Sequence, residues 1–281
     1  MGDQRRERGR DDDSVGGNSR EHRTVVWVSA GAASAVAAKL VLAQGPAVLA
    51  YTDPGSEDAD NARFLDDLEG WFGQPILRLR SDKYRDVDDV IERTRWINGT
   101  KGARCTAELK RAVRFRFQRP TDRQVFGYTV EEKDRAALVE ENDPGIDWWW
   151  PLIEADLSKS DVLAIVERAG LTLPRTYAMG YEHANCIGCV KANNFTYWNM
   201  VRVDFPEVFA RRARQEREIG HAICSEEATP GSRAKSPVWL DELDPERGKG
   251  RPMPRIECSL FCVGVEADLL AEASTRDGAA A

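Results

Sequence analysis

The sequence has no long hydrophobic run and no apolar segment at its N-terminus. Its apolar stretches all fall short of the roughly eighteen consecutive residues that a membrane-spanning helix needs. The first residues are rich in Arg and Asp, unlike the apolar core of a secretory signal. We therefore expect a cytoplasmic protein with no membrane partner. In that setting, the 6 cysteines favour metal binding or catalytic thiols over structural disulfides.

The chain also lacks an excess of positive charge. Its formal net charge of -7 argues against a general nucleic-acid coat protein, although a local basic face could still bind a phosphate backbone. With 281 residues, of which 42% are hydrophobic, the chain can form one large domain or one domain with an appendage. Residues 1–23 are mostly charged, Gly, Ser or Asn and predict a disordered tail, and we expect residues 266–281 to be flexible.

An apolar strand, a turn of small residues and a helix follow one another over residues 25–40. The turn, residues 29–34, has no lysine of the kind that ends a P-loop, and Gly31 is its only glycine, so Gly-x-Gly-x-x-Gly is absent too. Small side chains let an anion approach the backbone N–H groups that open the helix. The turn therefore predicts a phosphate site, and the alternative is an ordinary strand-to-helix connection.

A second short strand, residues 47–51, ends at the polar residues 52–57. Because ligands bind at the carboxyl ends of parallel strands, the two strand ends together predict one nucleotide site. A helix is expected over residues 58–72, a strand over 76–79 and a helix over 86–97. This alternation predicts an α/β fold, with about five mainly parallel strands and helices on both faces of the sheet.

Four segments resemble the motifs of one family, the PP-loop ATP pyrophosphatases of the phosphoadenosine phosphosulfate (PAPS) reductase-like branch. Residues 29–34 resemble Ser-Gly-Gly-x-Asp-Ser, residues 52–57 resemble Asp-Thr-Gly-x-Glu, residues 105–110 resemble Cys-Thr-x-x-Leu-Lys, and residues 127–135 resemble Gly-x-x-x-x-Glu-x-x-Arg. Their order and spacing match over about residues 24–262. The chain departs from the family at Ala30 and Ala33, which replace Gly and Asp, and at Pro54, which replaces Thr.

The resemblance implies an adenine nucleotide alpha hydrolase-like fold that uses ATP and Mg²⁺ and releases pyrophosphate as it adenylates a substrate. It implies that Lys110 and Arg135 neutralise phosphate charge during catalysis. The residues that it places around ATP are Ser29, Ala30, Gly31, Ala32, Ser34, Thr52, Asp53, Gly55 and Glu57. Within the family, the chain is most similar to the DndC- and SspD-type DNA phosphorothioation proteins. That similarity implies a cysteine desulfurase as sulfur donor and DNA or another nucleic acid as acceptor.

Two cysteine pairs, Cys186-x-x-Cys189 and Cys258-x-x-x-Cys262, lie in the second half of the chain. Each places two thiolates on a short turn, and four soft ligands suit tetrahedral zinc or an iron–sulfur cluster. The pairs therefore predict a metal site made of Cys186, Cys189, Cys258 and Cys262. The resemblance favours a [4Fe-4S] cluster, with a structural Zn²⁺ as the alternative. We divide the chain into a nucleotide-binding domain, residues 24–155, and a helical, cysteine-rich part, residues 156–265.

Two other functions stay open. The first is a PAPS or adenylylsulfate reductase, whose Glu-Cys-Gly-x-His motif is present only in part at residues 257–261, without the histidine. The second is a non-catalytic module that binds a nucleotide or a nucleic acid, which pyrophosphate release from ATP would distinguish from an enzyme.

Several further segments carry weaker expectations. Arginines alternate with phenylalanines over residues 111–119, which predicts a basic stripe for a polyanion or a strand with one charged face. At least one of the tryptophans at 148–150 should pack in the core, and Cys224 should be buried and inert. His183 is a weak candidate for a metal ligand. Ser160 is a candidate cap for a helix at 161–169, and residues 229–254 should form a mobile loop.

Overall fold

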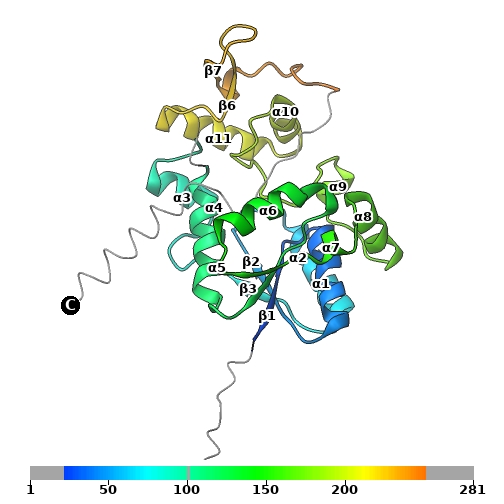
Figure 1. Ribbon diagram of the computed structural model, residues 1–281. Coiled ribbons are helices and arrows are strands. Elements are labelled where there is room, and N and C mark those ends of the chain that lie inside the picture. The colour runs from blue at the N-terminus through cyan, green and yellow to red at the C-terminus, as the bar shows by residue number, and fades with distance from the viewer. Residues whose placement is uncertain (1–21, 100–101, 251–281) are drawn as a thin grey trace, which may run out of the picture.

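The computed structural model describes residues 22–99 and 102–250. A five-stranded sheet with the strand order β3-β2-β1-β4-β5 forms its centre (Figure 1). The strands are β1 (Thr24–Val28), β2 (Val48–Thr52), β3 (Leu77–Leu79), β4 (Arg123–Val125) and β5 (Asp147–Trp149), and every pairing is parallel. The predicted α/β class with a parallel sheet is confirmed, and the architecture is Rossmann-like.

Helices alternate with these strands and then continue alone. They are α1 (Ala32–Gln44), α2 (Asp60–Phe72), α3 (Val87–Thr94), α4 (Arg104–Thr106), the π-helical turn η1 (Ala107–Arg111), α5 (Ala112–Phe117), η2 (Val130–Glu132), α6 (Lys133–Asn142), α7 (Pro151–Glu154), α8 (Lys159–Arg168), α9 (Arg175–Ala178), α10 (Phe195–Asp204), α11 (Pro206–Ile219) and η3 (Leu240–Glu242). A hairpin of β6 (Cys224–Glu227) and β7 (Lys235–Val238) lies between α11 and η3. None of the helices in the described part of the chain combines the length and the apolar composition that crossing a membrane requires.

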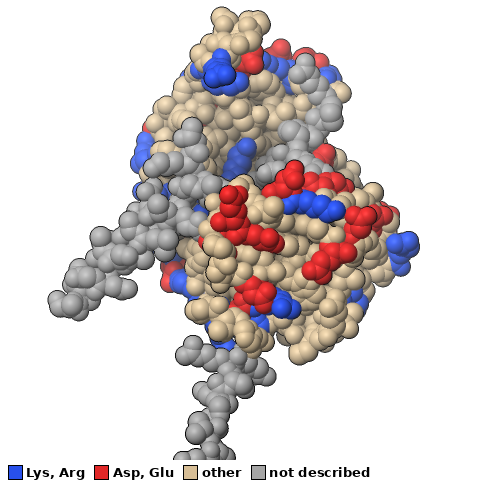
Figure 2. Space-filling view, viewed as in Figure 1, with Lys and Arg blue, Asp and Glu red and all other residues tan. Residues whose placement is uncertain are grey.

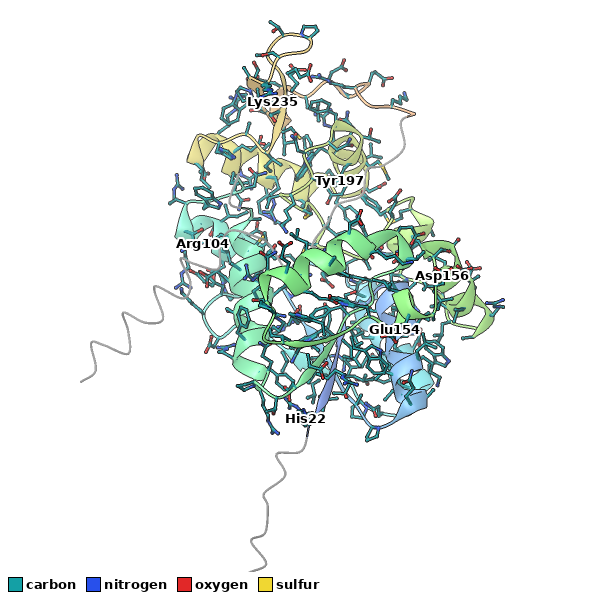
Figure 3. The ribbon with its side chains drawn as sticks, viewed as in Figure 1. His22, Arg104, Glu154, Asp156, Tyr197 and Lys235 are labelled. Atoms are coloured by element: carbon teal, nitrogen blue, oxygen red, sulfur yellow. The ribbon has the colours of Figure 1, made fainter. Side chains whose placement is uncertain are left out.

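Both faces of the sheet are covered because alternate residues of its strands point to opposite sides. Val26 and Val28 of β1 pack with α1, α2 and α8 on one face. Trp27 of the same strand packs on the other face, with Phe126 and with residues of α6. Figure 3 shows the side chains that fill the space between the sheet and its helices. The tryptophan segment contributes to the second face, since Trp150 stacks on Tyr128 with ring centroids 5.0 Å apart.

A second hydrophobic cluster joins α3, η1, α10, α11 and η3 around the fully buried Trp198. Two arginines of α11 hold this helix against α3. Arg211 and the buried Arg212 both form ion pairs with Asp88 of α3. The predicted division of the chain at residue 155 stays a prediction. In the structure, α8 packs with the sheet and α3 packs with the second cluster.

The structure corrects several local expectations. Residues 111–117 are helical, not extended, and two of their arginines, Arg111 and Arg114, are only 1% and 0% exposed, so they form no basic stripe on the surface. Helix α8 starts earlier than expected, because Ser158 and not Ser160 accepts the capping hydrogen bond from the Asp161 N–H. Residues 229–254 do not form one long loop, since β7 and η3 lie within them. Most of the predicted N-terminal tail and the whole C-terminal tail lie outside the described residues.

Candidate functional site

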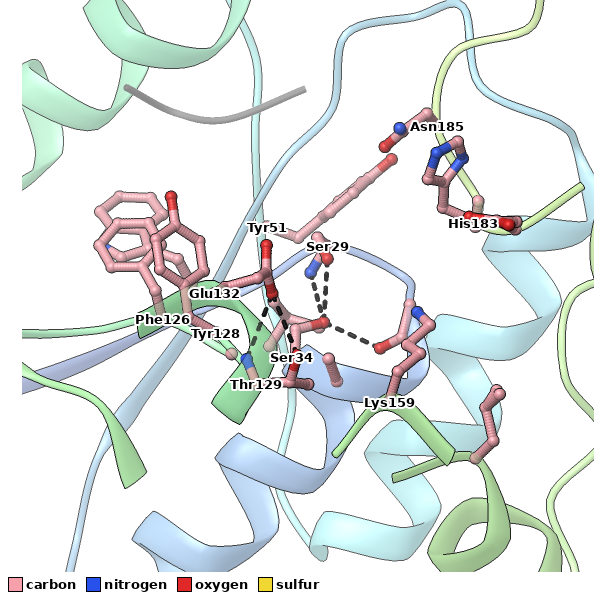
Figure 4. A pocket seen from close by; sticks show the side chains of 18 of the residues that line it. Ser29, Ser34, Tyr51, Phe126, Tyr128, Thr129, Glu132, Lys159, His183 and Asn185 are labelled. Atoms are coloured by element: carbon pink, nitrogen blue, oxygen red, sulfur yellow. Dashed lines mark hydrogen bonds between the residues drawn. The ribbon is translucent and has the colours of Figure 1, made fainter. Parts of the chain in front are cut away.

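A cleft of about 490 Å³ opens at the carboxyl ends of β1 and β4 (Figure 4). The strand order reverses between these two neighbours, because the chain runs outward from β1 to β3 and then returns past β1 to form β4. Ligands of open parallel sheets bind at such reversals, where the two connections leave the sheet in opposite directions. The volume is within the range typical of small-molecule sites. The loop at residues 29–34 forms one wall of the cleft.

The hydroxyl of Ser34 holds the loop in shape. It accepts a hydrogen bond from the Ser29 N–H at 2.9 Å and donates one to the Gly31 carbonyl oxygen at 3.0 Å. Gly31 is the N-cap of α1, and the first turn of this helix contains no acidic side chain. The loop is therefore preorganised, and the positive end of a 13-residue helix meets the cleft.

Ala30 has the backbone conformation of a glycine. Its φ is 54°, in the left-handed region, and its side chain is fully buried. The motif that this loop resembles has glycine at the same position. The replacement by alanine has therefore kept the backbone shape of the loop, at the expense of local strain.

Gly127 brings the end of β4 against the start of α1. A Cβ atom on this glycine would lie 2.6 Å from the Ser34 backbone N and 2.7 Å from the Ala33 carbonyl oxygen. Any residue other than glycine would clash here, because both neighbours are backbone atoms and cannot move aside as a flexible side chain can. The glycine of the fourth motif thus fixes that motif beside the loop at residues 29–34.

Arg135 and Glu132 line the same cleft as a pair. The Arg135 Nη1 lies 2.7 Å from the Glu132 Oε1, and its guanidinium stacks over the ring of Tyr128 at 4.5 Å. Glu132 in turn caps its own helix by accepting a hydrogen bond from the Thr129 N–H. The guanidinium is therefore held in place in the cleft that the loop at residues 29–34 also lines.

Lys110 enters the cleft from the other side, supported by Glu57. Its Nζ lies 3.2 Å from Glu57 Oε1, and the two side chains are only 11% and 5% exposed. Glu57 also accepts hydrogen bonds from the Tyr51 hydroxyl and the Asn61 amide. Burial raises the pKa of the Glu57 carboxyl, and Lys110 opposes that rise. Glu57 lies behind the ammonium group and is not part of the cleft wall.

The predicted ATP-binding residues divide into two sets. Those that line the cleft are Ser29, Gly31, Ser34 and Thr52, and those that do not line it are Ala30, Ala32, Asp53, Gly55 and Glu57. Asp53 binds Arg80 through one carboxylate oxygen and the Gly55 N–H through the other. Both predicted catalytic residues, Lys110 and Arg135, line the cleft.

Lys159, Tyr177 and residues 182–185 also line the cleft, and no motif in the sequence marks them as nucleotide-site residues. Lys159 is the first residue of α8, and α9 carries Tyr177. The segment at 182–185, which includes His183, is anchored because the Asn61 amide donates to the Ala184 carbonyl oxygen at 2.9 Å. Lys159 reaches the site through the packing of α8 on α1, and the later segment through its contact with α2, and no local motif encodes either arrangement.

Cys186 and Cys189 are both buried, next to the 52–57 segment. The Ile187 N–H between them donates to the Ser56 carbonyl oxygen at 3.0 Å, and Gly188 has a φ of 66°. Cys105, which belongs to neither cysteine pair, borders the same small gap as Cys186, Cys189 and Lys110. Its position within the Cys-Thr motif was the available signal.

The predicted metal site extends beyond the structure. Cys258 and Cys262 lie outside the described residues, and within residues 22–99 and 102–250 no three His, Cys, Asp or Glu side chains are grouped closely enough to hold an ion. Binding of zinc or a cluster stays a prediction, and His183 lines the cleft. Cys224 is buried as predicted, and burial raises the pKa of its thiol to about 12, which keeps it protonated and unreactive.

No protein-family model matches the chain, and no curated protein sequence matches it. The functional assignment therefore depends on the geometry of the cleft and on the chemistry of the residues that line it.

Proposed function

We propose that the protein is an ATP pyrophosphatase of the adenine nucleotide alpha hydrolase-like class, which transfers AMP to a substrate and releases pyrophosphate. One observation carries the proposal: the small-residue loop and both motif cations, Lys110 and Arg135, line a single cleft. A helix N-terminus and two fixed cations suit a polyphosphate chain, because each neutralises negative charge on the phosphate oxygens. An uncharged ligand would gain nothing from them.

The reaction needs positioning and charge neutralisation more than a nucleophile from the protein. A substrate oxygen attacks the α-phosphorus, the bond to the bridging α–β oxygen breaks, and pyrophosphate leaves with the electron pair. Lys110 and Arg135 stabilise the charge that develops on the phosphate oxygens. Glu57 and Glu132 hold these cations in place before the substrate arrives, which is the arrangement that makes electrostatic catalysis effective.

Mg²⁺ fits the cleft chemically, since Glu132 and Glu182 provide carboxylate oxygens beside the phosphate loop. These two carboxylates would hold the ion, which would supply positive charge to stabilise the phosphate oxygens. Glu132 also forms the ion pair with Arg135. Mg²⁺ bound there would therefore act on the same phosphate chain as Lys110 and Arg135.

The adenylated group is a DNA phosphate, which then accepts sulfur in a cytoplasmic reaction. The terminal sulfur of a persulfide on a cysteine desulfurase attacks the phosphorus, and AMP leaves as the phosphorus–oxygen bond to it breaks. A thiol then cleaves the S–S bond to the donor cysteine, which leaves the sulfur on the DNA phosphate and a disulfide as the oxidised product. Cys186 and Cys189 support the sulfur chemistry, because their segment is hydrogen-bonded to the loop after β2.

The DNA acceptor cannot approach the cleft over α6. Figure 2 shows Asp and Glu side chains gathered on that face, and α6 itself carries Asp134, Glu140 and Glu141. A phosphate backbone requires positive potential, so it must reach the cleft from another side.

The test measures the products of labelled ATP with anaerobically purified protein, with and without DNA. AMP and pyrophosphate are expected, and release of ADP and phosphate would contradict the proposal. Gly31→Val is the site-blocking variant: a Cβ there lies at 3.4 Å from the Tyr177 hydroxyl, so one methyl group fits but a branched side chain does not. Gly31→Ala is its control. Binding of ATP without pyrophosphate release would indicate a non-catalytic module.

A further inference from the structure

Tyr177 directs its hydroxyl group at the start of α1. The hydroxyl oxygen lies 3.4 Å from the position that a Cβ on Gly31 would occupy, and Tyr177 lines the cleft opposite the phosphate loop. The oxygen is buried and has no hydrogen-bond partner among the residues that the structure describes. The backbone N–H of Ala32 faces it closely enough to influence its pKa, without reaching the geometry of a normal hydrogen bond.

A buried hydroxyl without an acceptor is rare in folded proteins, because it loses its hydrogen bonds to water and gains none in return. Burial raises the pKa of Tyr177 to about 12, so the group is a neutral donor at physiological pH. Its O–H therefore lacks an acceptor within the described chain, and a ligand in the cleft can supply one.

The surrounding charges indicate what kind of acceptor fits. The Lys159 Nζ lies 5.7 Å from the centre of the Tyr177 ring, and the N-terminus of α1 lies next to the hydroxyl. Both favour negative charge. An anionic oxygen satisfies the hydroxyl and these positive groups together, whereas a neutral carbonyl satisfies only the hydroxyl.

Contacts of the neighbouring Arg175 fix the position of Tyr177. The guanidinium of Arg175, in the same short helix, binds both carboxylate oxygens of Asp58 at 2.8 and 2.7 Å. The Arg175 backbone N–H also donates to Asp60 of α2 at 2.8 Å. Tyr177 is thus held beside the loop by contacts to α2 that a ligand in the cleft does not need to break.

We propose that Tyr177 donates its hydroxyl hydrogen to the diphosphate part of the bound ligand and, with Lys159, forms the outer wall of the phosphate subsite. This inference rests on the proposed function, since it assigns two further residues to the same nucleotide. It distinguishes the diphosphate from the nucleoside: the contact contributes to pyrophosphate binding and not to adenosine binding.

The test compares the affinities for inorganic pyrophosphate and for adenosine by calorimetry. Tyr177→Phe should weaken pyrophosphate binding about tenfold or more, the usual loss for a hydrogen bond to a charged group, and leave adenosine binding unchanged. Its melting temperature should not fall, because the hydroxyl has no partner to lose. Tyr181→Phe is the matched control: that hydroxyl donates to Asp204 at 3.0 Å, so this variant should lose stability and keep its pyrophosphate affinity.

Unchanged or tighter pyrophosphate binding by Tyr177→Phe would overturn the inference, and tighter binding would show that the hydroxyl obstructs the subsite. An equal loss of adenosine affinity would overturn it as well. A wild-type protein that binds pyrophosphate but does not form AMP from ATP refutes the proposed function alone, and the comparison with Tyr177→Phe still decides the role of the hydroxyl. A wild-type protein that binds no pyrophosphate refutes both.

Discussion

Lys110 and Glu57, 53 residues apart in the chain, meet at 3.2 Å at the back of the cleft. The lysine comes from the Cys-Thr motif and the glutamate from the segment after β2. Asn61 extends the contact, because its amide donates both to Glu57 and to the Ala184 carbonyl oxygen. One small network therefore connects the catalytic candidate, through Glu57 and Asn61, to Ala184 in another part of the cleft wall.

Replacing Lys110 should remove turnover with little loss of ATP binding. A preorganised cation that stabilises transition-state charge contributes about two to four orders of magnitude to the rate, and we expect Lys110→Ala to lose that much. Pyrophosphate release at saturating ATP is the measurement. A loss of less than about threefold would remove Lys110 from the catalytic group.

The same variant leaves the Glu57 carboxylate buried without its cation, so a stability loss of roughly 3–5 kcal/mol is expected. The double variant Glu57→Gln with Lys110→Gln separates the two effects, because it removes both charges. It should recover much of the stability and none of the turnover. Recovery of turnover in the double variant would show that Lys110 acts only by pairing with Glu57.

Gly127→Ala should disturb both the fold and the site. The added methyl group would lie within 2.7 Å of backbone atoms of Ala33, and α1 must move to admit it. We expect a loss of about 1–3 kcal/mol in unfolding free energy and weaker ATP binding. Gly70→Ala is the control: nothing lies within 4 Å of its added Cβ, and it is inside α2, so this variant should gain up to about 1 kcal/mol. Urea unfolding of both variants tests the contrast.

Ala30→Gly should be nearly neutral, although it removes a buried methyl group. Glycine removes the left-handed backbone strain, which is about 1–2 kcal/mol. This gain offsets the free energy lost with the buried methyl group and the greater conformational entropy of the unfolded chain. Ala35→Gly, at an equally buried position inside α1, relieves no strain and should cost about 2 kcal/mol. Equal losses in the two variants would contradict the strained loop.

How far the sequence predicted the structure depends on the range of the interactions. The strand, turn and helix around residues 29–34 were predictable because each neighbour in the chain shapes the next. The meeting of Lys110 and Arg135 in one cleft followed from the resemblance, which encodes long-range contacts that composition does not. The sheet class followed from the alternation of strands and helices, whose hydrophobic patterns are local.

The errors arose where distant packing overrides local pattern. Arg111 and Arg114 look like surface residues, yet the Arg114 guanidinium lies 4.6 Å from the ring of Phe115 and 5.7 Å from that of Trp148. Tyr177 and Lys159 belong to no motif and reach the cleft only because the helices that follow the sheet fold back over α1. Cys105 lies beside Cys186 and Cys189 although they are distant in the sequence, because α4 packs with the second hydrophobic cluster.

The cysteine prediction concerns metal content. Ser substitution of Cys186 or Cys189 should release the bound ion or cluster, because the site joins segments that are distant in sequence. A [4Fe-4S] cluster predicts a brown protein with broad visible absorption after anaerobic purification, and zinc predicts a colourless one. Cys224→Ser is the control, since this buried thiol should not be a ligand. Metal-free protein that is folded and active would contradict both forms of the site.

Glu216 should make stability depend on pH in an unusual direction. Its carboxyl is fully buried and accepts hydrogen bonds from the Ile223 N–H at 2.5 Å and the Leu240 N–H at 2.8 Å. Burial raises its pKa from 4.5 to about 7, in spite of these donors. A raised pKa means that the folded state binds the proton more tightly than the unfolded state does.

The stabilisation from protonated Glu216 is therefore complete below about pH 4.5 and is lost as the pH rises through about 7. Between pH 5 and pH 8, this group should lower the unfolding free energy by up to about 3 kcal/mol. Glu216→Gln does not titrate, and its amide leaves one backbone N–H without an acceptor, so its stability loss from that source is the same at every pH. Urea unfolding of both proteins at these two pH values isolates the difference, because all other groups titrate alike in both. Parallel pH dependences would show that Glu216 keeps an ordinary pKa despite its burial.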